Sequence, residues 1–372
     1  MEKIGIIGVG RLGICLALNL EKVGYDIVAV DKSVQRIAEI NSRVIESPEP
    51  YVASYLKAAK HISASDDLNT ILDQKVKLVF ICVPTPSKVD GTFNHSYIDE
   101  VVDGLKALTK PTEPVELIIN STTMPGYCET LQKELSDYNY IISYNPEFIA
   151  QGNIIWDQQY PDQVLIGESN FNSGNCIAEI YLKMCPDLSE NSINKMSCTS
   201  AEITKLAVNC MLTTRIAFAN SIGDMASTYG AETNKILDAI GADKRIGKAY
   251  LKYGSGYGGP CLPRDNRALG KAAEKNGVEL LIGKATDQSN QTHLAFQVAE
   301  ILNQNEIKKQ IVFDQVAYKS DTDILEESQQ LALAVALMKA GKPVLIRETK
   351  MVIDQVKARY GNQFSYEIRD NE

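Results

Sequence analysis

The feature that most constrains this chain is a glycine motif between an apolar strand and a helix. The motif is Gly8-Val9-Gly10-Arg11-Leu12-Gly13. Residues 3–8 before it are apolar, and residues 12–23 after it repeat leucine at helical spacing. Residues 26–30 form a second apolar run that ends at Asp31. Strand, glycine turn, helix and strand make a βαβ unit, which requires a parallel sheet.

Each glycine of this motif has a distinct steric role in a dinucleotide site. Gly8 permits a tight turn, Gly10 lets a pyrophosphate approach the backbone, and Gly13 lets helix and strand pack closely. Asp31 is placed to accept hydrogen bonds from ribose hydroxyls, which favours NAD over NADP. Arg36 weakens that preference, because a nearby arginine could hold a 2′-phosphate. A chance glycine turn is the alternative interpretation.

The alternation of strands and helices continues along the first half of the chain. Apolar runs at 77–83, 115–119 and 139–143 predict further strands, so we expect a doubly wound dinucleotide-binding domain over 1–197. Thr199 to Glu202 fits a capping box with Thr199 as the N-cap. A helix is then expected from 201 to about 229.

Residues 198–300 are expected to form a central helical domain, interrupted by a glycine-rich loop at 252–265. The α/β pattern resumes from residue 310. Strands are predicted at 311–313, 343–346 and 364–368, and a helix is predicted at 327–340. The predicted architecture is therefore two Rossmann-like doubly wound domains joined by a helical domain, the last one short and spanning 301–372.

Composition excludes several classes of function. The chain has 372 residues and a formal net charge of −9, which disfavours nucleic-acid binding. No apolar run is long enough to span a membrane. The eight cysteines are scattered and the three histidines (His61, His95, His293) lie far apart, so we expect reduced thiols in the cytoplasm and no metal site. All three histidines are interpreted as ordinary surface or core residues.

Cys261 lies in the segment with the strongest chemical signal. Four glycines fall within residues 254–259, just before Cys261, and Asp265 follows four residues later. Glycines leave a backbone that can wrap a ligand closely, and functional groups concentrate on such loops. Cys15, Cys82 and Cys210 instead lie in apolar helices or strands and read as structural. The alternative is a flexible surface loop that carries an incidental thiol.

Two further segments carry polar side chains at suggestive positions. Lys205 and Asn209 are four residues apart and share a helical face with Glu202, although a solvated face is the plainer interpretation. Asn145-Pro146-Glu147-Phe148 follows a predicted strand, at the end of the sheet where ligands bind. The carboxylate of Glu147 could act as a base or simply as a helix cap.

Taken together, these segments resemble the UDP-glucose/GDP-mannose dehydrogenase family over nearly the whole chain. The matching stretches, in order, are Gly8–Gly13, Val83-Pro84-Thr85-Pro86, Ser121-Thr122, Asn145–Phe148 with Gly152, Pro161-Asp162, Ile166-Gly167, Glu202/Lys205/Asn209, Asp243/Arg245-Ile246-Gly247 and Gly256–Asp265. The resemblance implies an NAD-dependent, four-electron oxidation of the C6 hydroxyl of a UDP-sugar, such as UDP-glucose to UDP-glucuronate.

The resemblance also implies the roles of individual residues. Cys261 is the nucleophile that forms a thioester, Lys205 stabilises the oxyanion, and Glu147 is the base for hydrolysis. Asp265 and Thr122 position water or handle protons, and Asn209 completes the catalytic set.

The implied binding residues cluster in a few segments. For the cofactor they are Gly8, Val9, Gly10, Arg11, Leu12, Gly13, Asp31, Arg36, Val83, Pro84, Thr85, Ser121, Thr122 and Gln151. For the nucleotide-sugar they are Glu147, Phe148, Ile149, Ala150, Gln151, Lys205, Asn209, Arg245, Lys252, Tyr253, Gly254, Ser255, Gly256, Tyr257, Gly258, Tyr318 and Lys319. Arg245 matches a residue that reaches the substrate of a neighbouring subunit, so a homodimer through the central helix is implied.

The chain departs from the family pattern at several positions. Asn120 replaces a lysine, Gln151 replaces a glutamate, and Tyr318-Lys319 replaces Phe-Lys. Glu326 stands where the family has an arginine that faces the cofactor, and Asp314-Gln315 stands where it has a glycine.

Several functions therefore stay open. They are the same chemistry on GDP-mannose or a UDP-N-acetyl-hexosamine, a degenerate nucleotide-sugar binder, and a two-electron β-hydroxyacid dehydrogenase, which would need no cysteine.

Overall fold

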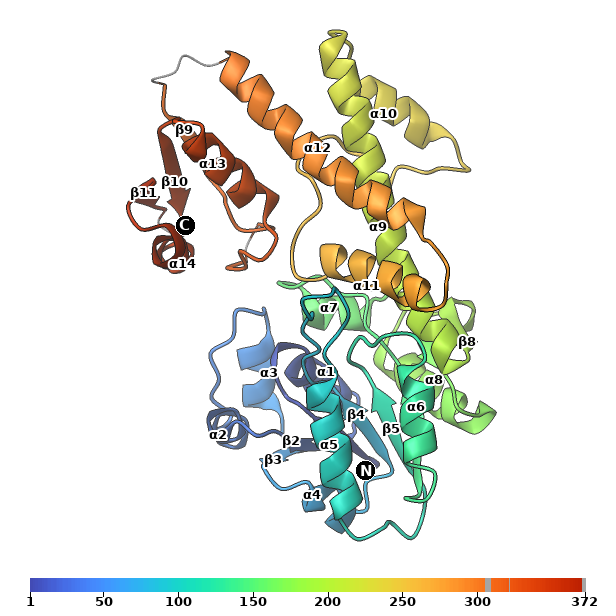
Figure 1. Cartoon of the computed structure of the whole chain (residues 1–372). Helices are drawn as coiled ribbons and strands as arrows, with labels where there is room; N and C mark the ends of the chain where they lie inside the picture. Colours follow the sequence, from blue (N-terminus) through green and yellow to red (C-terminus); the bar gives the residue numbers. More distant parts are fainter. Residues whose placement is uncertain (305–308, 321, 370–372) are drawn as a thin grey trace. The chain divides into compact units, whose positions relative to one another are not determined.

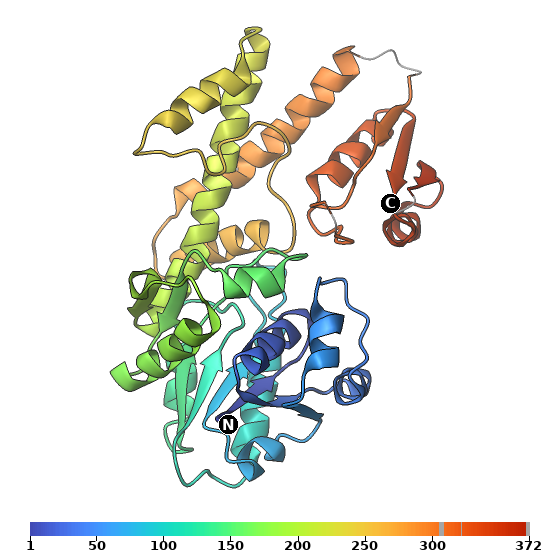
Figure 2. The same cartoon turned by 180° about the vertical axis from the view of Figure 1, so that it is seen from behind.

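The structure is a computed structural model that describes residues 1–304, 309–320 and 322–369. It divides into two compact units, Met1–Lys205 and Leu206–Glu372. Figures 1 and 2 show both units from opposite sides. In the described residues, none of the helices combines the length and apolar character that crossing a bilayer requires.

The first unit is built on one eight-stranded sheet with the order β3-β2-β1-β4-β5-β6-β7-β8. Its strands are β1 (Lys3–Ile7), β2 (Asp26–Val30), β3 (Ile62–Ser65), β4 (Leu78–Ile81), β5 (Val115–Ile119), β6 (Tyr140–Tyr144), β7 (Val164–Gly167) and β8 (Ile193–Met196). All neighbours pair in parallel except β6 and β7. The first six strands have the doubly wound order of a dinucleotide-binding domain, whose direction reverses between β1 and β4.

Helices cover both faces of this sheet and close two apolar cores. One core contains α1 (Arg11–Lys22), α2 (Val34–Ser42), α3 (Val52–Ala58), α7 (Ile154–Gln159) and α8 (Phe171–Met184). The other contains α4 (Asn69–Asp73), α5 (Ser96–Ala107), α6 (Tyr127–Glu134) and the start of α9 (Cys198–Thr228). Because both faces of the sheet are covered, the inner strands β1, β2, β4, β5 and β6 are mostly apolar and buried, whereas the edge strands β3 and β8 are more polar and partly exposed.

The start of α9 differs from the predicted capping box. The helix begins at Cys198, and the hydroxyl of Ser197 accepts the backbone N–H of Ser200 at 3.2 Å, so Ser197 and not Thr199 is the N-cap. Glu202 is buried and accepts backbone N–H groups of Gly126 and Cys128 at 2.6 and 2.9 Å. It therefore caps α6 instead of its own helix. The local sequence motif could not reveal this long-range partner.

The second unit combines a helical region with a small sheet. The remainder of α9, α10 (Thr233–Ala242), α11 (Leu262–Lys275) and α12 (Leu281–Gln304) form the helical region. Hydroxyl contacts join α9 to α12, such as Ser221 with Ser289 at 2.8 Å. The sheet has the order β11-β10-β9, and both of its strand pairs are parallel. Its elements are β9 (Ile311–Phe313), α13 (Gln329–Lys339), β10 (Val344–Glu348), α14 (Lys350–Tyr360) and β11 (Ser365–Ile368).

The predicted fold class is confirmed: a large α/β domain, a helical region and a second parallel α/β element follow one another along the chain. Strands β3, β7 and β8 were not predicted. The predicted loop at 252–265 ends too late, because α11 begins at Leu262. Pro263 reads as a loop residue in sequence, but proline is well tolerated in the first turn of a helix.

Candidate active site

The glycine turn after β1 has the steric properties that a dinucleotide site requires. Gly8 has a φ of +89°, and a Cβ atom on Gly13 would lie 2.0 Å from the carbonyl oxygen of Gly8. Neither position accepts a larger residue. A Cβ on Gly10 would meet no protein atom within 4 Å, so the backbone there faces open space at the N-terminus of α1. That space and the adjacent helix N–H groups fit a pyrophosphate.

Asp31, at the end of β2, is held beside this turn by two backbone donors. Its carboxylate accepts the N–H of Val9 at 2.8 Å and the N–H of Ser33 at 2.8 Å. A carboxylate can accept about four hydrogen bonds, so acceptor capacity is left for ribose hydroxyls. Arg36 forms an ion pair with Glu39 at 3.0 Å, which offsets its charge locally.

The loops after β4 and β5 lie against each other. The hydroxyl of Ser121 donates to the carbonyl oxygen of Val83 at 2.6 Å. Thr85 and Ser121 are buried, Thr122 is half-buried and Pro84 is exposed. These residues follow adjacent strands at the carboxyl edge of the sheet, beside the glycine turn, which is where a doubly wound fold binds its ligand.

Glu147 follows β6 and has polar side chains as neighbours. Its Oε1 atom is 3.5 Å from the amide nitrogen of Asn120, 3.4 Å from that of Gln158 and 3.5 Å from the hydroxyl of Tyr181. These contacts are long and therefore weak. Burial is the main cause that raises the pKa of Glu147 to about 7, while the amide donors and the charge of Lys205 oppose the shift. A carboxyl group with this pKa can exchange a proton near neutral pH.

Lys205 on α9 lies close enough to Glu147 for its charge to act on that carboxyl group. It is 7% exposed, and its ammonium group lies 4.6 Å from the ring centroid of Phe148. Lys205 also lowers the pKa of Glu147 through its charge. The first unit thus brings together a buried cation, a titratable carboxyl and an aromatic ring.

The segment after Glu147 is held to the glycine turn by a polar network. Arg11 donates to the side-chain oxygen of Gln151 at 2.8 Å. Glu49 is buried and accepts the N–H of Gly152 at 2.9 Å, and it lies 3.9 Å from the guanidinium of Arg11. Ile149 packs against the neighbouring apolar core and Ala150 is half-buried. Glu49 belongs to no sequence motif, so its part in this network was not predicted.

In the second unit, Cys261 occupies the N-cap of α11 and is half-buried. Its carbonyl oxygen accepts the N–H of Asp265 at 2.9 Å, which closes the first helical turn. Asp265 therefore lies on a helix and not on the loop predicted from the sequence. The start of a helix favours a negative charge, which suits a thiolate.

Asn209 and Asp265 form a buried contact between α9 and α11. The amide nitrogen of Asn209 donates to Oδ2 of Asp265 at 2.7 Å, and both residues are buried. The predicted members Asn209, Asp265 and Cys261 are thus brought together by two elements that are far apart in sequence.

Asparagine side chains hold the backbone of the glycine loop before Cys261. Asn220 accepts the N–H of Gly254 and donates to the carbonyl oxygen of Ser255, at 3.0 and 3.2 Å. Asn290 makes the same reciprocal pair with Tyr257, at 3.0 Å in each direction. Each asparagine side chain thereby supplies hydrogen bonds that the loop backbone would otherwise lack, because the loop is not paired in a helix or a sheet.

His293 also supports this loop. One ring nitrogen lies 2.8 Å from the carboxylate of Asp224, and the other lies 2.6 Å from the carbonyl oxygen of Gly254. His293 is buried, which is one of the two positions that the sequence analysis left open, but its contact with the predicted substrate segment was not predicted. The sequence separation of 39 between His293 and Gly254 leaves no local signal.

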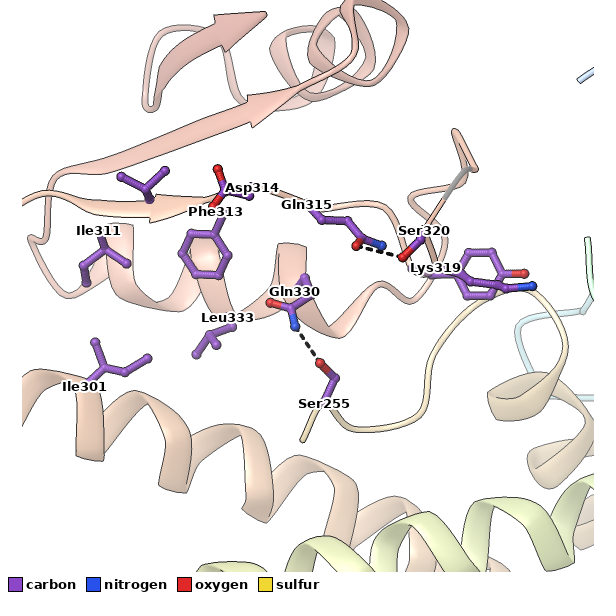
Figure 3. A pocket seen from close by; sticks show the side chains of 12 residues that line it. Ser255, Ile301, Ile311, Phe313, Asp314, Gln315, Lys319, Ser320, Gln330 and Leu333 are labelled. Atoms are coloured by element: carbon purple, nitrogen blue, oxygen red, sulfur yellow. Dashed lines mark hydrogen bonds between the residues drawn. The ribbon is translucent and has the colours of Figure 1, made fainter. Parts of the chain in front are cut away.

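Two cavities adjoin the glycine loop. One, of about 550 Å³, is lined by residues that include Ser255, Tyr318 and Lys319 (Figure 3). The other, of about 410 Å³, is lined by residues that include Lys252, Tyr253 and Gly256. Seven predicted substrate residues of the second unit therefore border two cavities that share Ser255, namely Lys252, Tyr253, Gly254, Ser255, Gly256, Tyr318 and Lys319. Asn209, Tyr257 and Gly258 line neither cavity.

Arg245 lies apart from these cavities, on the exposed segment between α10 and the glycine loop. Its guanidinium pairs with Asp243 at 2.6 Å, and 88% of its side chain is exposed. Arg215 on α9 fixes the segment by donating to the carbonyl oxygens of Ile246, Gly247 and Ala249, at 2.7 to 2.9 Å.

The remaining thiols lack the environment of Cys261. Burial raises the pKa of Cys15 to about 12 and raises that of Cys82 further. Such thiols stay protonated near neutral pH, so they are poor nucleophiles. In the described part of the chain, no group of three histidine, cysteine, aspartate or glutamate side chains could hold a metal ion.

Two family models match the chain. Residues 2–185 match the NAD binding domain of the UDP-glucose/GDP-mannose dehydrogenase family, and residues 199–292 match the central domain of that family. Together these ranges cover well over half of the 372 residues.

Known proteins agree with this assignment. A UDP-glucose 6-dehydrogenase of Rickettsia bellii is 29% identical over 346 residues, covering 91% of this chain and 79% of the relative. A UDP-glucose dehydrogenase structure from Pyrobaculum islandicum shares the fold, with a TM-score of 0.87 at 24% identity, over 100% of this chain and 86% of that one. A GDP-mannose dehydrogenase structure from Pseudomonas aeruginosa has a TM-score of 0.60 at 27% identity, over 97% and 84%. The chain belongs to the UDP-glucose/GDP-mannose dehydrogenase family, whose members are NAD-dependent oxidoreductases.

Proposed function

We propose that this chain oxidises the C6 hydroxyl of a UDP-sugar to a carboxylate through a thioester on Cys261, with UDP-glucose as the substrate and UDP-glucuronate as the product. The observation that carries the proposal is the placement of Cys261 at the N-cap of α11, one turn from the buried Asp265–Asn209 pair. A two-electron hydroxyacid dehydrogenase has no use for a thiol there.

The residues of the first unit fit NAD. The open space at Gly10 and the N-terminus of α1 would hold the pyrophosphate, and Asp31 would accept the ribose hydroxyls. Ser121 with Val83, Pro84 and Thr85 would border the cofactor on the far side of the switch between β1 and β4. When bound, NAD accepts the hydride in each of the two oxidations.

The proposed chemistry has four steps. The C6 carbon loses a hydride and its hydroxyl group loses a proton, which gives an aldehyde. The Cys261 thiolate adds to the aldehyde carbon, and the oxyanion takes up a proton to give a thiohemiacetal. The thiohemiacetal then loses a second hydride from C6 and its hydroxyl proton, which gives a thioester. Water then breaks the carbon–sulfur bond, which releases the carboxylate and restores the thiol.

Each of the candidate catalytic side chains has a separate proposed role in these steps. Lys205 is a buried cation and would stabilise the oxyanion that forms when sulfur or water attacks the carbon. Glu147, with a pKa of about 7, would take the proton of the attacking water. Asp265 and Thr122 would position that water, and Asn209 would orient Asp265.

We expect the cavity lined by Tyr318 and Lys319 to select the base of the nucleotide-sugar. GDP-mannose and a UDP-N-acetyl-hexosamine are the alternative substrates. A nucleotide-sugar binder without activity is the alternative function.

We also propose that the enzyme is a homodimer through α9. Met211, Phe218 and Met225 follow at intervals of seven residues, and each is between 47% and 59% exposed. An apolar stripe of this kind suits a second copy of the same helix. Arg245, exposed at 88%, would then be available to the partner's substrate. Phe218→Glu should shift the molar mass in light scattering from dimer to monomer.

The decisive test is to offer a panel of nucleotide-sugars with NAD and count the NADH formed per sugar consumed. We expect two NADH with UDP-glucose, because an aldehyde held beside a thiolate proceeds to the second oxidation. A yield of one, with aldehyde or ketone as the product, would contradict the thioester route. Binding of a sugar without any NADH would favour the inactive binder.

Cys261→Ser tests the role of the thiol directly, and Cys210→Ser is its matched control. We expect Cys261→Ser to abolish release of the acid while sugar and cofactor still bind, because the glycine loop is unchanged. Cys210→Ser, at a buried thiol on α9, should retain the two-NADH yield.

A further inference from the structure

The turn before α13 packs directly against the glycine loop that precedes Cys261. A Cβ atom on Gly258 would lie 2.3 Å from the carbonyl oxygen of Glu327, and one on Gly259 would lie 2.4 Å from the ring of Tyr318. The amide of Gln330 donates to the hydroxyl of Ser255 at 2.5 Å (Figure 3). These glycines therefore make room for a neighbouring protein segment as well as for a ligand.

Glu327 adopts an unusual backbone conformation in this turn. Its φ is +51°, in the left-handed region that non-glycine residues rarely adopt. The flanking residues fix it there, because Leu325 and Ser328 are buried and the hydroxyl of Ser328 donates to the carbonyl oxygen of Val316 at 2.7 Å. The side chain of Glu327 is thus presented in one defined direction.

Arg267 on α11 receives that side chain. Its two terminal nitrogens donate to the two carboxylate oxygens of Glu327 at 2.8 and 3.2 Å, a bidentate arrangement. The Nε atom of the same guanidinium lies 3.5 Å from Asp287 on α12. Asp287 in turn accepts hydrogen bonds from the hydroxyl of Tyr257 and, at 3.0 Å, from the amide of Asn266.

We propose that Arg267 and Glu327 form a latch that holds the turn before α13 on the glycine loop, and that this latch sets the affinity for the nucleotide-sugar. The inference rests on the proposed function, since that function makes residues 252–258 the substrate cradle. The pair is half-exposed, and such pairs contribute little to stability. The consequence of breaking it should therefore appear in the position of the loop and not in the unfolding temperature.

The test compares Arg267→Glu, Glu327→Arg and the charge-swapped double variant with wild type. Each single reversal should raise the KM for UDP-glucose about five- to tenfold, with little change in kcat. The swap should recover part of the loss, because the carboxylate introduced at position 267 regains its partner at 327 but also lies near Asp287. Amide hydrogen exchange should accelerate at 254–259 and 326–330 in the single variants and slow again in the swap. The exchange result does not depend on turnover.

Lys271→Glu is the control, because it reverses a charge on the same helix in a pair of similar exposure, Lys271–Glu274 at 2.8 Å. It should leave KM and exchange unchanged. If a charge-reversal variant fails to fold, Arg267→Gln and Glu327→Gln remove the charge instead. They should raise KM and accelerate amide exchange in the same direction as the reversals, but by less.

The latch would be overturned if the single variants had the amide exchange and the KM of wild type. It would also be overturned if the swap recovered neither quantity. Faster exchange at both segments in a protein that oxidises no nucleotide-sugar would support the latch as a structural contact while refuting the proposed function and the effect on substrate affinity.

Discussion

Asn209 and Asp265 share a hydrogen bond of 2.7 Å that joins α9 to α11 in a buried environment. Removing the donor leaves a buried carboxylate oxygen without that partner, which costs about 1–3 kcal/mol. We expect Asn209→Ala to lower the free energy of unfolding by about that amount, measured in urea. Unchanged stability would mean that another group replaces the amide.

Asn209→Asp provides a sharper comparison. Two carboxylates at this distance repel each other, so this variant should be less stable than Asn209→Ala near neutral pH. Acidification should recover stability, because a protonated carboxyl can donate the missing hydrogen bond. A variant whose stability falls with acidification in the same way as wild type would contradict this account.

The backbone contacts of Asp31 explain a predicted preference for NAD. Val9 and Ser33 fix the carboxylate, so a 2′-phosphate would meet a negative charge that cannot turn away. We expect Asp31→Asn to shift the ratio of kcat/KM for NADP over NAD upward by about tenfold, equivalent to about 1.4 kcal/mol. Equal efficiency of wild type with both cofactors would contradict the preference, and loss of NADP use in Arg36→Ala would then identify the cation responsible.

The raised pKa of Glu147 predicts how the rate depends on pH. A base works in its ionised form, so kcat should rise as pH increases through about 7, if hydrolysis limits the rate. Glu147→Gln should hydrolyse the thioester slowly and lose this dependence. Trapping of acyl-enzyme, detected by mass spectrometry, would identify hydrolysis as the blocked step. A Glu147→Gln variant that hydrolyses the acyl-enzyme at the wild-type rate in single-turnover experiments would exclude Glu147 as the base.

The raised pKa of Glu147 also makes the stability of the protein depend on pH. Between the ordinary pKa of 4.5 and the folded value of about 7, the folded state binds more protons than the unfolded state, so stability falls as pH rises through this window. Glu147→Gln carries no such proton. It should therefore be more stable than wild type near pH 8, and the difference should shrink toward pH 4.5.

The sequence predicted the features whose partners are local. We could predict the glycine turn, Asp31 and the strand ends because strand, turn and helix follow one another within about 30 residues. Cys261 could be singled out as a candidate functional residue because a structural cysteine rarely follows four glycines. Its neighbour Asp265 was misplaced on a loop, because Pro263 and the glycines conceal the helix start.

Residues that act over long separations could not be predicted. Glu202 caps a helix 74 to 76 positions away, His293 contacts a loop 39 positions away, and Arg267 pairs 60 positions along the chain. On sequence alone each is one charged or polar residue on a helix. Only the packing of the helices gives them their partners.

Glu326 is the remaining departure with a testable consequence. The family resemblance implies a cation at this position, facing the cofactor, so a glutamate would repel an anionic dinucleotide. We therefore expect weak NAD binding in wild type and tighter binding in Glu326→Arg. A like-charge contact in a partly desolvated site costs about 1–3 kcal/mol, which corresponds to about ten- to a hundredfold in Kd.

The helix predicted at 327–340 offers a competing interpretation, in which Glu326 is an ordinary acid at the start of that helix, and the structure contradicts it. Helix α13 begins at Gln329 after the N-cap Ser328, whose hydroxyl accepts the N–H of Leu331 at 3.2 Å. Glu326 is exposed and precedes the cap by two residues, outside the first turn where a helix dipole acts. Glu326→Arg should thus leave the unfolding temperature unchanged, so that a change in NAD affinity, titrated by calorimetry, reports the cofactor contact alone. Unchanged affinity together with unchanged stability would mean that this side chain does not meet the cofactor.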